Sequence, residues 1–375
     1  MSGRQDMQDV AEEAMTQTPR VAAMPMASLG PTARALFEKF GIDELLLYTL
    51  PMKVRFRGIS LRHGLLIHGP GGWGEVAPFV EYDDHESASW LVAGLETARR
   101  GVPAPVRDKV SVNVTVPIIG AREAWELVSK SGCTTAKVKV AEPGYGIGFD
   151  LGRLSAVRDA LGPEGKIRID ANAGWDIDEA KNAIQQYDRA AGGLEYVEQP
   201  CQSIEDMIKL RAMIDVPVAA DECVRRAKDP LAGARAGAAD ILVFKAMPLG
   251  GPWRALELAQ ETDLPIVVSS ALGSTICLYV GMSLAAALPS MDFACGLGTS
   301  RMFLRDVTDE ESRIVQKDGF YTMPQTAPVP DRSVILYDEN DEGLERLKRE
   351  WVARLEDISN ALVNDPPPSA YILER

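Results

Sequence analysis

From residue 111 onward, short apolar runs alternate with segments in which apolar residues recur at helical spacing. The apolar runs predict strands at residues 112–116, 136–140, 167–170, 194–198, 216–221, 240–245, 265–269 and 291–295. Helices are predicted between them at 123–131, 149–161, 178–191, 204–214, 230–236, 252–262 and 278–288. Strands that alternate with helices form a parallel sheet with right-handed crossovers, and eight such units are typical of a TIM-type barrel. An open, doubly wound sheet is the alternative, but no Gly-x-Gly-x-x-Gly sequence follows the first strand.

The segments on either side of this alternation have a different pattern. Residues 1–27 are polar and aperiodic, which predicts a disordered extension. Residues 28–110 predict a small antiparallel sheet, with helices at 31–40 and 87–100 and strands at 45–56, 65–68 and around 72–75. Residues 326–375 contain a predicted strand at 334–337, a helix at 342–362 and a loose Pro-rich tail from 366. We therefore expect an α/β protein whose barrel spans 111–325 and whose N- and C-terminal segments form a second, α+β domain.

Composition and charge exclude several classes of function. The net charge of −14 argues against a nucleic-acid partner, because binding to phosphates needs a positively charged surface. The five cysteines form no Cys-x-x-Cys pair, which argues against a zinc cage or a disulfide framework and fits a reducing cytoplasm. The longest apolar run, at 276–288, is too short to span a membrane, and the N-terminus lacks the pattern of a signal sequence. We expect a cytoplasmic protein; the sequence leaves its oligomeric state open and is compatible with a monomer.

The distribution of histidine limits the chemistry of the barrel. The three histidines are His63, His68 and His85, so none falls within the predicted barrel. A Ser-His-Asp or Cys-His site, or a zinc ion bound by histidine, therefore cannot be built from barrel residues alone. Proton transfer in that domain must depend on Lys, Asp, Glu, Tyr or Cys.

Charged residues interrupt the apolar strands near their C-terminal ends. Lys137 and Lys139 lie two positions apart in one strand, so their side chains point to the same face. The following four strands each supply one further charged residue, in the order Asp170, Glu198, Asp221 and Lys245. Catalytic groups of barrel enzymes lie at this end of the strands. The sequence therefore predicts one site that gathers these side chains.

Three carboxylates that converge in a buried pocket repel one another, and a divalent cation relieves that repulsion. Ligation by carboxylate oxygens alone favours Mg²⁺, with Mn²⁺ as the alternative. A metal of this kind stabilises negative charge on a substrate carboxylate, as removal of the adjacent proton requires. Lysine would then be the base, and lowering its pKa from about 10.4 to ~7 requires roughly 4.6 kcal/mol. The geometry does not choose between Lys137 and Lys139, and Lys245 is either a second acid–base group or a fixed cation.

Each of these residues also has a simpler structural interpretation. Two lysines at a strand end are often solvated, and Asp170 or Asp221 could cap the helix that follows its strand. Glu222, next to Asp221, is expected to face away from the site. The repeated spacing of one strand–helix unit between the charged positions favours a shared site.

The charged residues and their neighbours resemble the enolase superfamily, in its muconate-lactonising-enzyme-like subgroup. The resemblance rests on Lys137-Val-Lys139, Asp170-Ala-Asn172, Glu198-Gln-Pro200, Asp221-Glu222 and Lys245. Longer segments resemble the actinobacterial type of o-succinylbenzoate synthase, at 54–58, 72–75, 135–144, 196–201, 248–251, 269–272 and 294–299. In total the resemblance covers about residues 42–325.

This resemblance implies a modified (β/α)7β barrel under a capping domain made of the N- and C-terminal segments. It implies Mg²⁺ at Asp170, Glu198 and Asp221, proton abstraction by Lys139 beside Lys137, and a cationic role for Lys245. It also implies that a small-molecule carboxylate, 2-succinyl-6-hydroxy-2,4-cyclohexadiene-1-carboxylate, is dehydrated to 2-succinylbenzoate in menaquinone biosynthesis. Substrate contacts would come from Asn172, Ser269, Ser270 and Arg55.

Two positions depart from the pattern of that family, and three other functions remain open. Cys223 and Gly273 stand where the family usually has Ser and Asp, and position 273 should lie near the succinyl group. The same site could racemise N-succinylamino acids or epimerise dipeptides. A Schiff-base aldolase could use Lys245, although it would leave the carboxylates unexplained. The barrel could also be a binding or scaffold protein without turnover.

Overall fold

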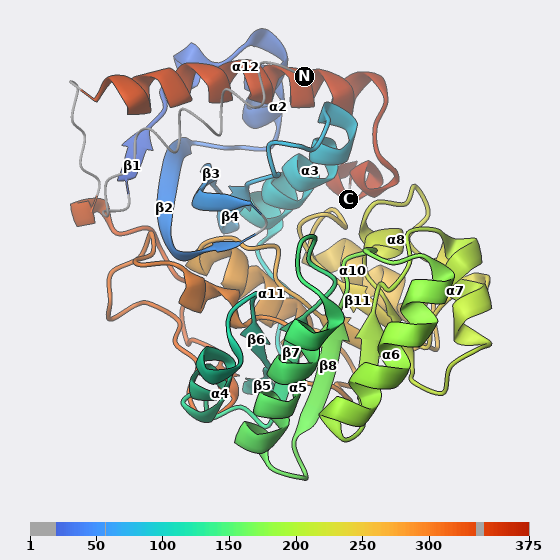
Figure 1. Cartoon of the computed structure of the whole chain (residues 1–375). Helices are drawn as coiled ribbons and strands as arrows, with labels where there is room; N and C mark the ends of the chain where they lie inside the picture. The colour runs from blue at the N-terminus through green and yellow to red at the C-terminus, as the bar shows by residue number, and fades with distance from the viewer. Residues whose placement is uncertain (1–19, 57, 335–340, 375) are drawn as a thin grey trace.

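The computed structural model describes residues 20–56, 58–334 and 341–374 and shows a barrel beneath a cap (Figure 1). Seven parallel strands form the barrel sheet, in the order β12-β11-β10-β9-β8-β7-β6. They are β6 (Val114–Val116), β7 (Thr135–Lys139), β8 (Lys166–Asp170), β9 (Tyr196–Glu198), β10 (Val218–Ala220), β11 (Ile241–Phe244) and β12 (Ile266–Val268). The helices are α4 (Ala121–Ser129), α5 (Ile147–Leu161), α6 (Ile177–Ala191), α7 (Ile204–Arg211), α8 (Glu222–Arg225), α9 (Ala232–Arg235), α10 (Pro252–Gln260) and α11 (Thr275–Ala287). The predicted barrel architecture is confirmed.

The barrel is closed by a segment shorter than the strand predicted at 291–295, so that prediction is wrong. Cys295 forms a parallel bridge to Val112, and Gly296 forms one to Ser269. Within the described chain, only Cys295 and Gly296 fill the gap between β12 and the segment that precedes β6. The residues before them therefore lie outside the sheet, and Pro289, Ser290 and Asp292 are exposed. A two-stranded ribbon of β5 (Lys109–Ser111) and β13 (Phe320–Thr322) lies beside this closure, and the 3-10 helix η2 (Gly298–Met302) follows it.

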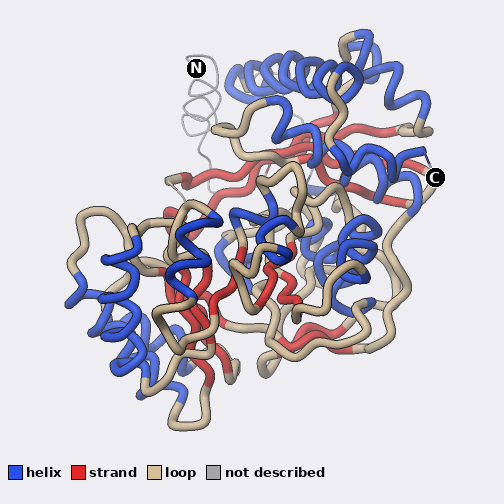
Figure 2. Tube along the Cα trace, turned by 90° about the vertical axis from the view of Figure 1, so that its right-hand side faces the viewer, coloured by secondary structure: helices blue, strands red, loops and turns tan. Residues whose placement is uncertain are grey.

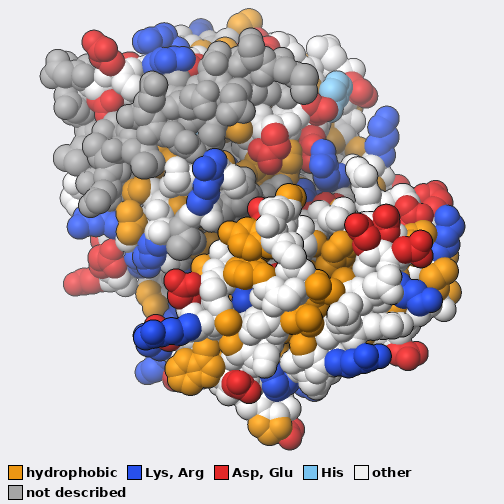
Figure 3. All heavy atoms as spheres, in the orientation of Figure 1, with side chains coloured by type: hydrophobic (Ala, Val, Ile, Leu, Met, Phe, Trp, Pro, Cys, Tyr) orange, Lys and Arg blue, Asp and Glu red, His pale blue; other side chains and the backbone are white. Residues whose placement is uncertain are grey.

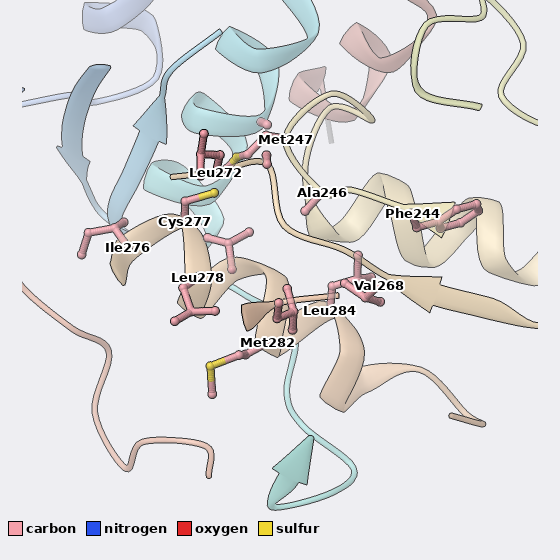
Figure 4. Packing of buried hydrophobic residues seen from close by; sticks show 14 of the residues in the cluster. Phe244, Ala246, Met247, Val268, Leu272, Ile276, Cys277, Leu278, Met282 and Leu284 are labelled. Carbon is pink, nitrogen blue, oxygen red and sulfur yellow. The ribbon is translucent and has the colours of Figure 1, made fainter. Parts of the chain in front are cut away.

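Helix α11 is buried on nearly all sides, which explains why helical periodicity placed its start three residues late. It contacts α10, β12 and the cap strand β4, so apolar residues occupy every face. Figure 4 shows Leu284 of this helix beside Val268 of β12, and Ile276 at the other end of the helix beside the cap strands. The helix begins after Ser274, whose hydroxyl accepts a hydrogen bond from the amide of Ile276 at 3.1 Å.

The cap combines both ends of the chain. Its antiparallel sheet contains β1 (Arg20–Ala23), β2 (Glu44–Phe56), β3 (Ile59–Gly69) and β4 (Gly72–Val76), in that order. Helices α2 (Pro31–Lys39), α3 (Asp84–Arg100) and α12 (Glu342–Asn364) complete it, and in Figure 2 the barrel lies below the cap. Trp351 and Leu355 of α12 share a buried core with Phe37 of α2 and Leu47 of β2. The C-terminal helix therefore packs on the N-terminal sheet, as the fold class predicted.

Several predicted boundaries need correction. Residues 20–27, assigned to a disordered extension, contain β1 and part of the 3-10 helix η1 (Met26–Ser28), because Val21 and Ala22 are fully buried against β2. The tail after 366 is not loose, since η4 (Pro368–Glu374) buries Ile372 and Leu373 in the core of the cap. The predicted helix 230–236 contains only the single turn α9. Residues 1–19 and most of the predicted strand 334–337 lie outside the described residues, and η3 (Arg332–Val334) precedes the latter gap.

His63 in the cap should make the protein sensitive to acid. Burial, with Arg62 and Arg354 nearby, lowers the pKa of His63 from its usual 6.5 to about 3. Its Nδ1 accepts a hydrogen bond from Trp351 Nε1 at 3.0 Å, which requires the neutral ring. The unfolded chain binds a proton below pH 6.5 and the folded chain does not, so the free energy of unfolding falls as the pH drops toward 3.

We expect His63→Gln to reduce this sensitivity, because glutamine can accept the same hydrogen bond without titrating. Between pH 7 and pH 4.5 the wild type should lose about 2.7 kcal/mol more unfolding free energy than the variant, at ~1.36 kcal/mol per pKa unit. Urea unfolding at both pH values measures the difference. Equal losses in the two proteins would contradict the role of His63.

The surface carries charged side chains of both signs. On the face shown in Figure 3, acidic and basic side chains are interspersed over the coloured atoms. Within residues 20–56, 58–334 and 341–374, no helix has the length and apolar character needed to cross a bilayer.

Candidate active site

The predicted charged residues meet at the C-terminal ends of the barrel strands. Lys139 is in register with Asp170, and Asp170 is in register with Glu198, so β7, β8 and β9 place three charged side chains in one row. Asp221 directly follows β10, and Lys245 directly follows β11. The sheet order therefore brings together all six residues that the sequence singled out.

These residues form two separate groups of ion pairs. The Nζ of Lys137 lies 2.6 Å from Glu198 Oε1 and 2.9 Å from Asp170 Oδ2. The Nζ of Lys139 lies 2.5 Å from Asp170 Oδ2 and donates to Asn172 Oδ1 at 2.7 Å. Across the site, Lys245 Nζ lies 2.5 Å from Asp221 Oδ2. The lysines are therefore not the solvated pair of the simpler interpretation.

The two lysines of β7 differ in their electrostatic surroundings. Burial alone would lower the pKa of the Lys137 ammonium, but Asp170 and Glu198 raise that pKa well above its usual value. Burial lowers the pKa of Lys139, and Lys137 lowers it further against the opposing effect of Asp170. Lys139 is therefore the more easily deprotonated member of the pair, a distinction that spacing along the strand could not provide.

The three carboxylates also differ from one another. Burial and repulsion from Asp170 raise the pKa of Glu198 to about 7. Burial would raise the pKa of Asp221 as well, but Lys245 and Arg225 hold it below its usual range. For Asp170, burial is likewise outweighed, and Lys137 and Lys139 hold its pKa well below normal.

The structure also tests whether the two aspartates serve as helix caps. Asp221 precedes α8, but its side chain accepts no capping hydrogen bond there. Asp170 Oδ1 accepts a hydrogen bond from the amide of Asn172 at 3.0 Å, within the turn that follows β8. Asp221 is therefore not a cap, and Asp170 supports a local turn while its other oxygen faces the lysines.

A narrow cleft, partly open to solvent, lies beside these charges. Lys137, Lys139 and Lys245 line it, as do the predicted substrate residues Asn172, Ser269 and Ser270. Arg55 does not line it: its side chain is exposed, and Nε donates to the carbonyl of Gly58 at 2.8 Å. The structure thus groups three of the four predicted substrate contacts with the charged residues.

The cap supplies part of the cleft that sequence analysis missed. Phe79, Tyr82 and Trp90 line it from the segment after β4 and from α3. Their rings contact one another, with centroids 5.5 Å apart for Phe79–Tyr82 and 6.3 Å apart for Tyr82–Trp90. No pattern within residues 79–90 indicates this role, because the aromatic wall becomes part of the site only when the cap docks on the barrel.

Gln199 is a further residue that sequence analysis did not assign. It is fully buried after β9 with a φ of 38°, a left-handed conformation that is uncommon for residues other than glycine. Its Oε1 accepts hydrogen bonds from the amides of Asp221 at 3.0 Å and Cys223 at 3.3 Å. Gln199 therefore holds the turn that carries Asp221 against the end of the neighbouring strand. The Cys223 thiol approaches the same oxygen at 3.4 Å, so this departure from the family pattern keeps a donor here.

The donor atoms suit Mg²⁺ or Mn²⁺. Asp170, Glu198 and Asp221 are each at most 1 % exposed, and both aspartates contribute to raising the pKa of Glu198, so the three charges repel. Among the described residues, no three acidic, His or Cys side chains surround a common point, since the Lys137 ammonium lies between Asp170 and Glu198. The donor atoms therefore have the chemistry that Mg²⁺ prefers, but in this arrangement the lysines occupy the carboxylate oxygens and the three side chains do not converge on one point.

Gly273 lies next to the cleft-lining residue Leu272, but a side chain at this position would point elsewhere. A Cβ built there would lie 2.3 Å from Glu75 Oε1 and 2.4 Å from Cys277 Cβ. Glu75 is buried, and it accepts hydrogen bonds from the Tyr48 hydroxyl and the Ser274 amide. The Asp that the family usually has at this position would therefore meet a buried carboxylate in this chain.

We expect Gly273→Ala to lower the unfolding free energy by about 1–3 kcal/mol, the usual cost of overpacking. Urea unfolding measures this change. Gly152→Ala in α5 is the matched control, because no heavy atom lies within 4 Å of its Cβ and φ is not positive. The control should be stabilised by roughly 0.5–1 kcal/mol. If Gly273→Ala were as stable as this control, the space between residue 273, Glu75 and Cys277 could expand to hold a methyl group.

Comparison with known proteins agrees with this geometry. Residues 120–328 match the enolase C-terminal domain-like family, and residues 47–98 match the enolase N-terminal domain-like family. Among solved structures, the L-Ala-D/L-Glu epimerase from Bacillus subtilis has a TM-score of 0.64 at 22 % identity and covers 77 % of this chain and 96 % of its own. The N-succinyl Arg/Lys racemase from Bacillus cereus has a TM-score of 0.64 at 19 % identity and covers 79 % and 97 %. At these identities the likeness shows the fold alone.

Curated relatives are much more similar in sequence. The o-succinylbenzoate synthase of Thermobifida fusca is 47 % identical over 82 % of this chain and 93 % of its own length. The o-succinylbenzoate synthase of Mycolicibacterium smegmatis is 47 % identical over 79 % and 90 %. Together with the barrel, the cap and the gathered charges, these similarities show that this chain is an enzyme of the enolase superfamily and belongs to the o-succinylbenzoate synthase family.

Proposed function

We propose that this enzyme dehydrates 2-succinyl-6-hydroxy-2,4-cyclohexadiene-1-carboxylate to 2-succinylbenzoate, as a step of menaquinone biosynthesis in the cytoplasm. The observation that carries this proposal is the position of Lys139 and Lys245 on strands β7 and β11, lining one cleft beside three buried carboxylates. The curated relatives named above carry the same activity in their names. All five cysteines are free thiols, which fits a reducing compartment.

Asp170, Glu198 and Asp221 would hold Mg²⁺, or Mn²⁺ in its place. When bound, the cation would stabilise negative charge that develops on the substrate carboxylate. The contacts of Lys137 and Lys139 with Asp170 would have to lengthen for that oxygen to serve as a ligand. Lys137 would remain protonated between the carboxylates and reduce their mutual repulsion.

Lys139 would first accept a proton from the substrate and then donate it to the leaving group. Its neutral Nζ accepts the proton from the ring carbon that bears the carboxylate, and the same nitrogen then returns it to the leaving hydroxyl as water departs. One C–H bond and one C–O bond break, and the ring becomes aromatic. Lys245, paired with Asp221, would face the negative charge as a fixed cation.

Optical measurement of aromatisation tests this proposal. We expect turnover of the cyclohexadiene carboxylate with Mg²⁺ and its loss in excess chelator, with recovery when Mg²⁺ is restored. Absence of aromatisation in a folded protein supplied with Mg²⁺ would overturn the assignment.

Racemisation or epimerisation on the same site is the second candidate. Lysines that line a cleft from two separate strands could remove a proton from one face of a substrate and return it to the other. Incubation with N-succinylamino acids and with dipeptides in deuterated water tests this function through loss of optical activity and deuterium uptake. Appreciable racemisation without aromatisation would favour this candidate over the dehydration.

A further inference from the structure

Arg225 connects the barrel carboxylates to the cap. It ends the single turn of α8, four residues after Asp221 and three after Glu222, and its side chain is 6 % exposed. Nε lies 3.2 Å from Asp221 Oδ1, and Nη2 lies 2.8 Å from Glu222 Oε1. Nη1 donates a hydrogen bond to the hydroxyl of Tyr82 at 2.7 Å. All three guanidinium nitrogens thus contact oxygen atoms, two from the barrel and one from the cap.

Asp221 lies between two cations with different attachments. Its Oδ2 is paired with Lys245, which belongs to the barrel wall. Its Oδ1 is paired only with Arg225 among the described ion pairs, and this contact lacks the alignment of a hydrogen bond. The orientation of the Asp221 carboxylate therefore depends on where Arg225 is held.

Tyr82 holds Arg225 from the side of the cap. Its ring is 2 % exposed and packs against Phe79 and Trp90, which also line the cleft. A displacement of the cap would therefore move the Tyr82 hydroxyl away from Arg225. The planar fork of arginine can join three oxygens at fixed angles, whereas the ammonium of a lysine is a single point charge.

We propose that Arg225 is a positioning residue that couples the seating of the cap, through Tyr82, to the orientation of Asp221. This inference rests on the proposed role of Asp221 as a Mg²⁺ ligand. Because coupling between two sites is reciprocal, Mg²⁺ binding at Asp221 should in turn hold the cap segment 79–90 more tightly. The cap would thus cover the cleft and also orient one of the carboxylates, that of Asp221.

Two variants that preserve charge test the coupling. Arg225→Lys keeps the cation but loses the fork, and Tyr82→Phe keeps the ring but loses the hydroxyl. Calorimetric titration gives Mg²⁺ affinity, and amide hydrogen exchange of residues 79–90 with and without Mg²⁺ gives the response of the cap. In the wild type we expect Mg²⁺ to slow this exchange. In both variants that response should disappear, and Mg²⁺ affinity should fall at least about fivefold.

Arg226→Lys is the matched control. Arg226 also reaches the cap, with Nε 3.0 Å from Glu86 Oε1 and its guanidinium 5.7 Å from the centroid of the Tyr82 ring, but its side chain is 55 % exposed and has no described contact with Asp221. It therefore tests whether a cap contact that does not reach Asp221 has the same effect. The Arg226→Lys variant should keep the wild-type Mg²⁺ affinity and exchange response.

If the wild type and both test variants show the same Mg²⁺ affinity and the same exchange response, the coupling is wrong and the proposed function stands. If the wild type binds no Mg²⁺, the proposed metal site is wrong and the coupling falls with it. Circular dichroism shows whether each variant is folded. If Arg225→Lys does not fold, the result for Tyr82→Phe alone decides whether the coupling exists.

Discussion

Replacing Lys139 by alanine is expected to lower turnover of the cyclohexadiene carboxylate by about 10²–10⁴-fold or more, the usual contribution of a general base. Of the two lysines on β7, Lys139 is the one whose pKa is lowered from its usual value, by burial and by Lys137. Lys137 is held as an ammonium by Asp170 and Glu198, so it cannot replace the lost base. The carboxylates remain, so Mg²⁺ affinity should be largely unchanged. The optical assay and calorimetry measure the two quantities on one preparation.

Lys166→Ala is the control for loss of a strand lysine. Lys166 begins β8, at the opposite end of the barrel from the cleft, and it is exposed. Its removal should leave turnover and Mg²⁺ affinity unchanged. Near-normal turnover of Lys139→Ala would show that the base is another residue. Loss of Mg²⁺ binding together with turnover would show that Lys139 instead holds the carboxylates in place.

Asp221→Asn is expected to weaken Mg²⁺ binding by at least about 10–100-fold, the effect usually seen when even an outer partner of a metal ligand is removed. Asparagine keeps the shape of the side chain but loses the charge, so the site loses electrostatic attraction for the cation. Lys245 and Arg225 would also lose the carboxylate that balances them in a buried site. We therefore expect a loss of unfolding free energy of about 3–5 kcal/mol as well. Calorimetric titration and urea unfolding measure the two effects.

Asp240→Asn removes a carboxylate from the other end of the same barrel wall. Asp240 pairs with Arg211 near the surface, with a side chain that is 33 % exposed. We expect Mg²⁺ affinity to be unchanged, and stability to change by about 1 kcal/mol or less, as is usual for an exposed pair. If Asp221→Asn bound Mg²⁺ as tightly as this control, Asp221 would not be a ligand.

Local sequence patterns were sufficient to predict the barrel and the meeting of most of the charged side chains. Strands and helices leave periodic patterns over a few residues, so seven of the eight barrel strands and their order along the chain could be read locally. Because parallel strands end at one edge, the positions of Asp170, Glu198, Asp221, Lys139 and Lys245 along the chain were enough to predict that they meet. The closing segment at Cys295 and Gly296 was misplaced, since two bridging residues leave no period to detect.

The tertiary structure alone decided the features that depend on contacts between distant segments. The cap brings Phe79, Tyr82 and Trp90 to the cleft, and it packs Ala22 and Leu373 into one core, although neither short segment has a pattern of its own. The difference between Lys137 and Lys139 comes from which carboxylates surround each ammonium, and the role of Arg225 from a hydroxyl 143 positions away. Local sequence encodes the direction of a side chain along its own strand or helix. Burial, charge and partners depend on what the rest of the chain places around it.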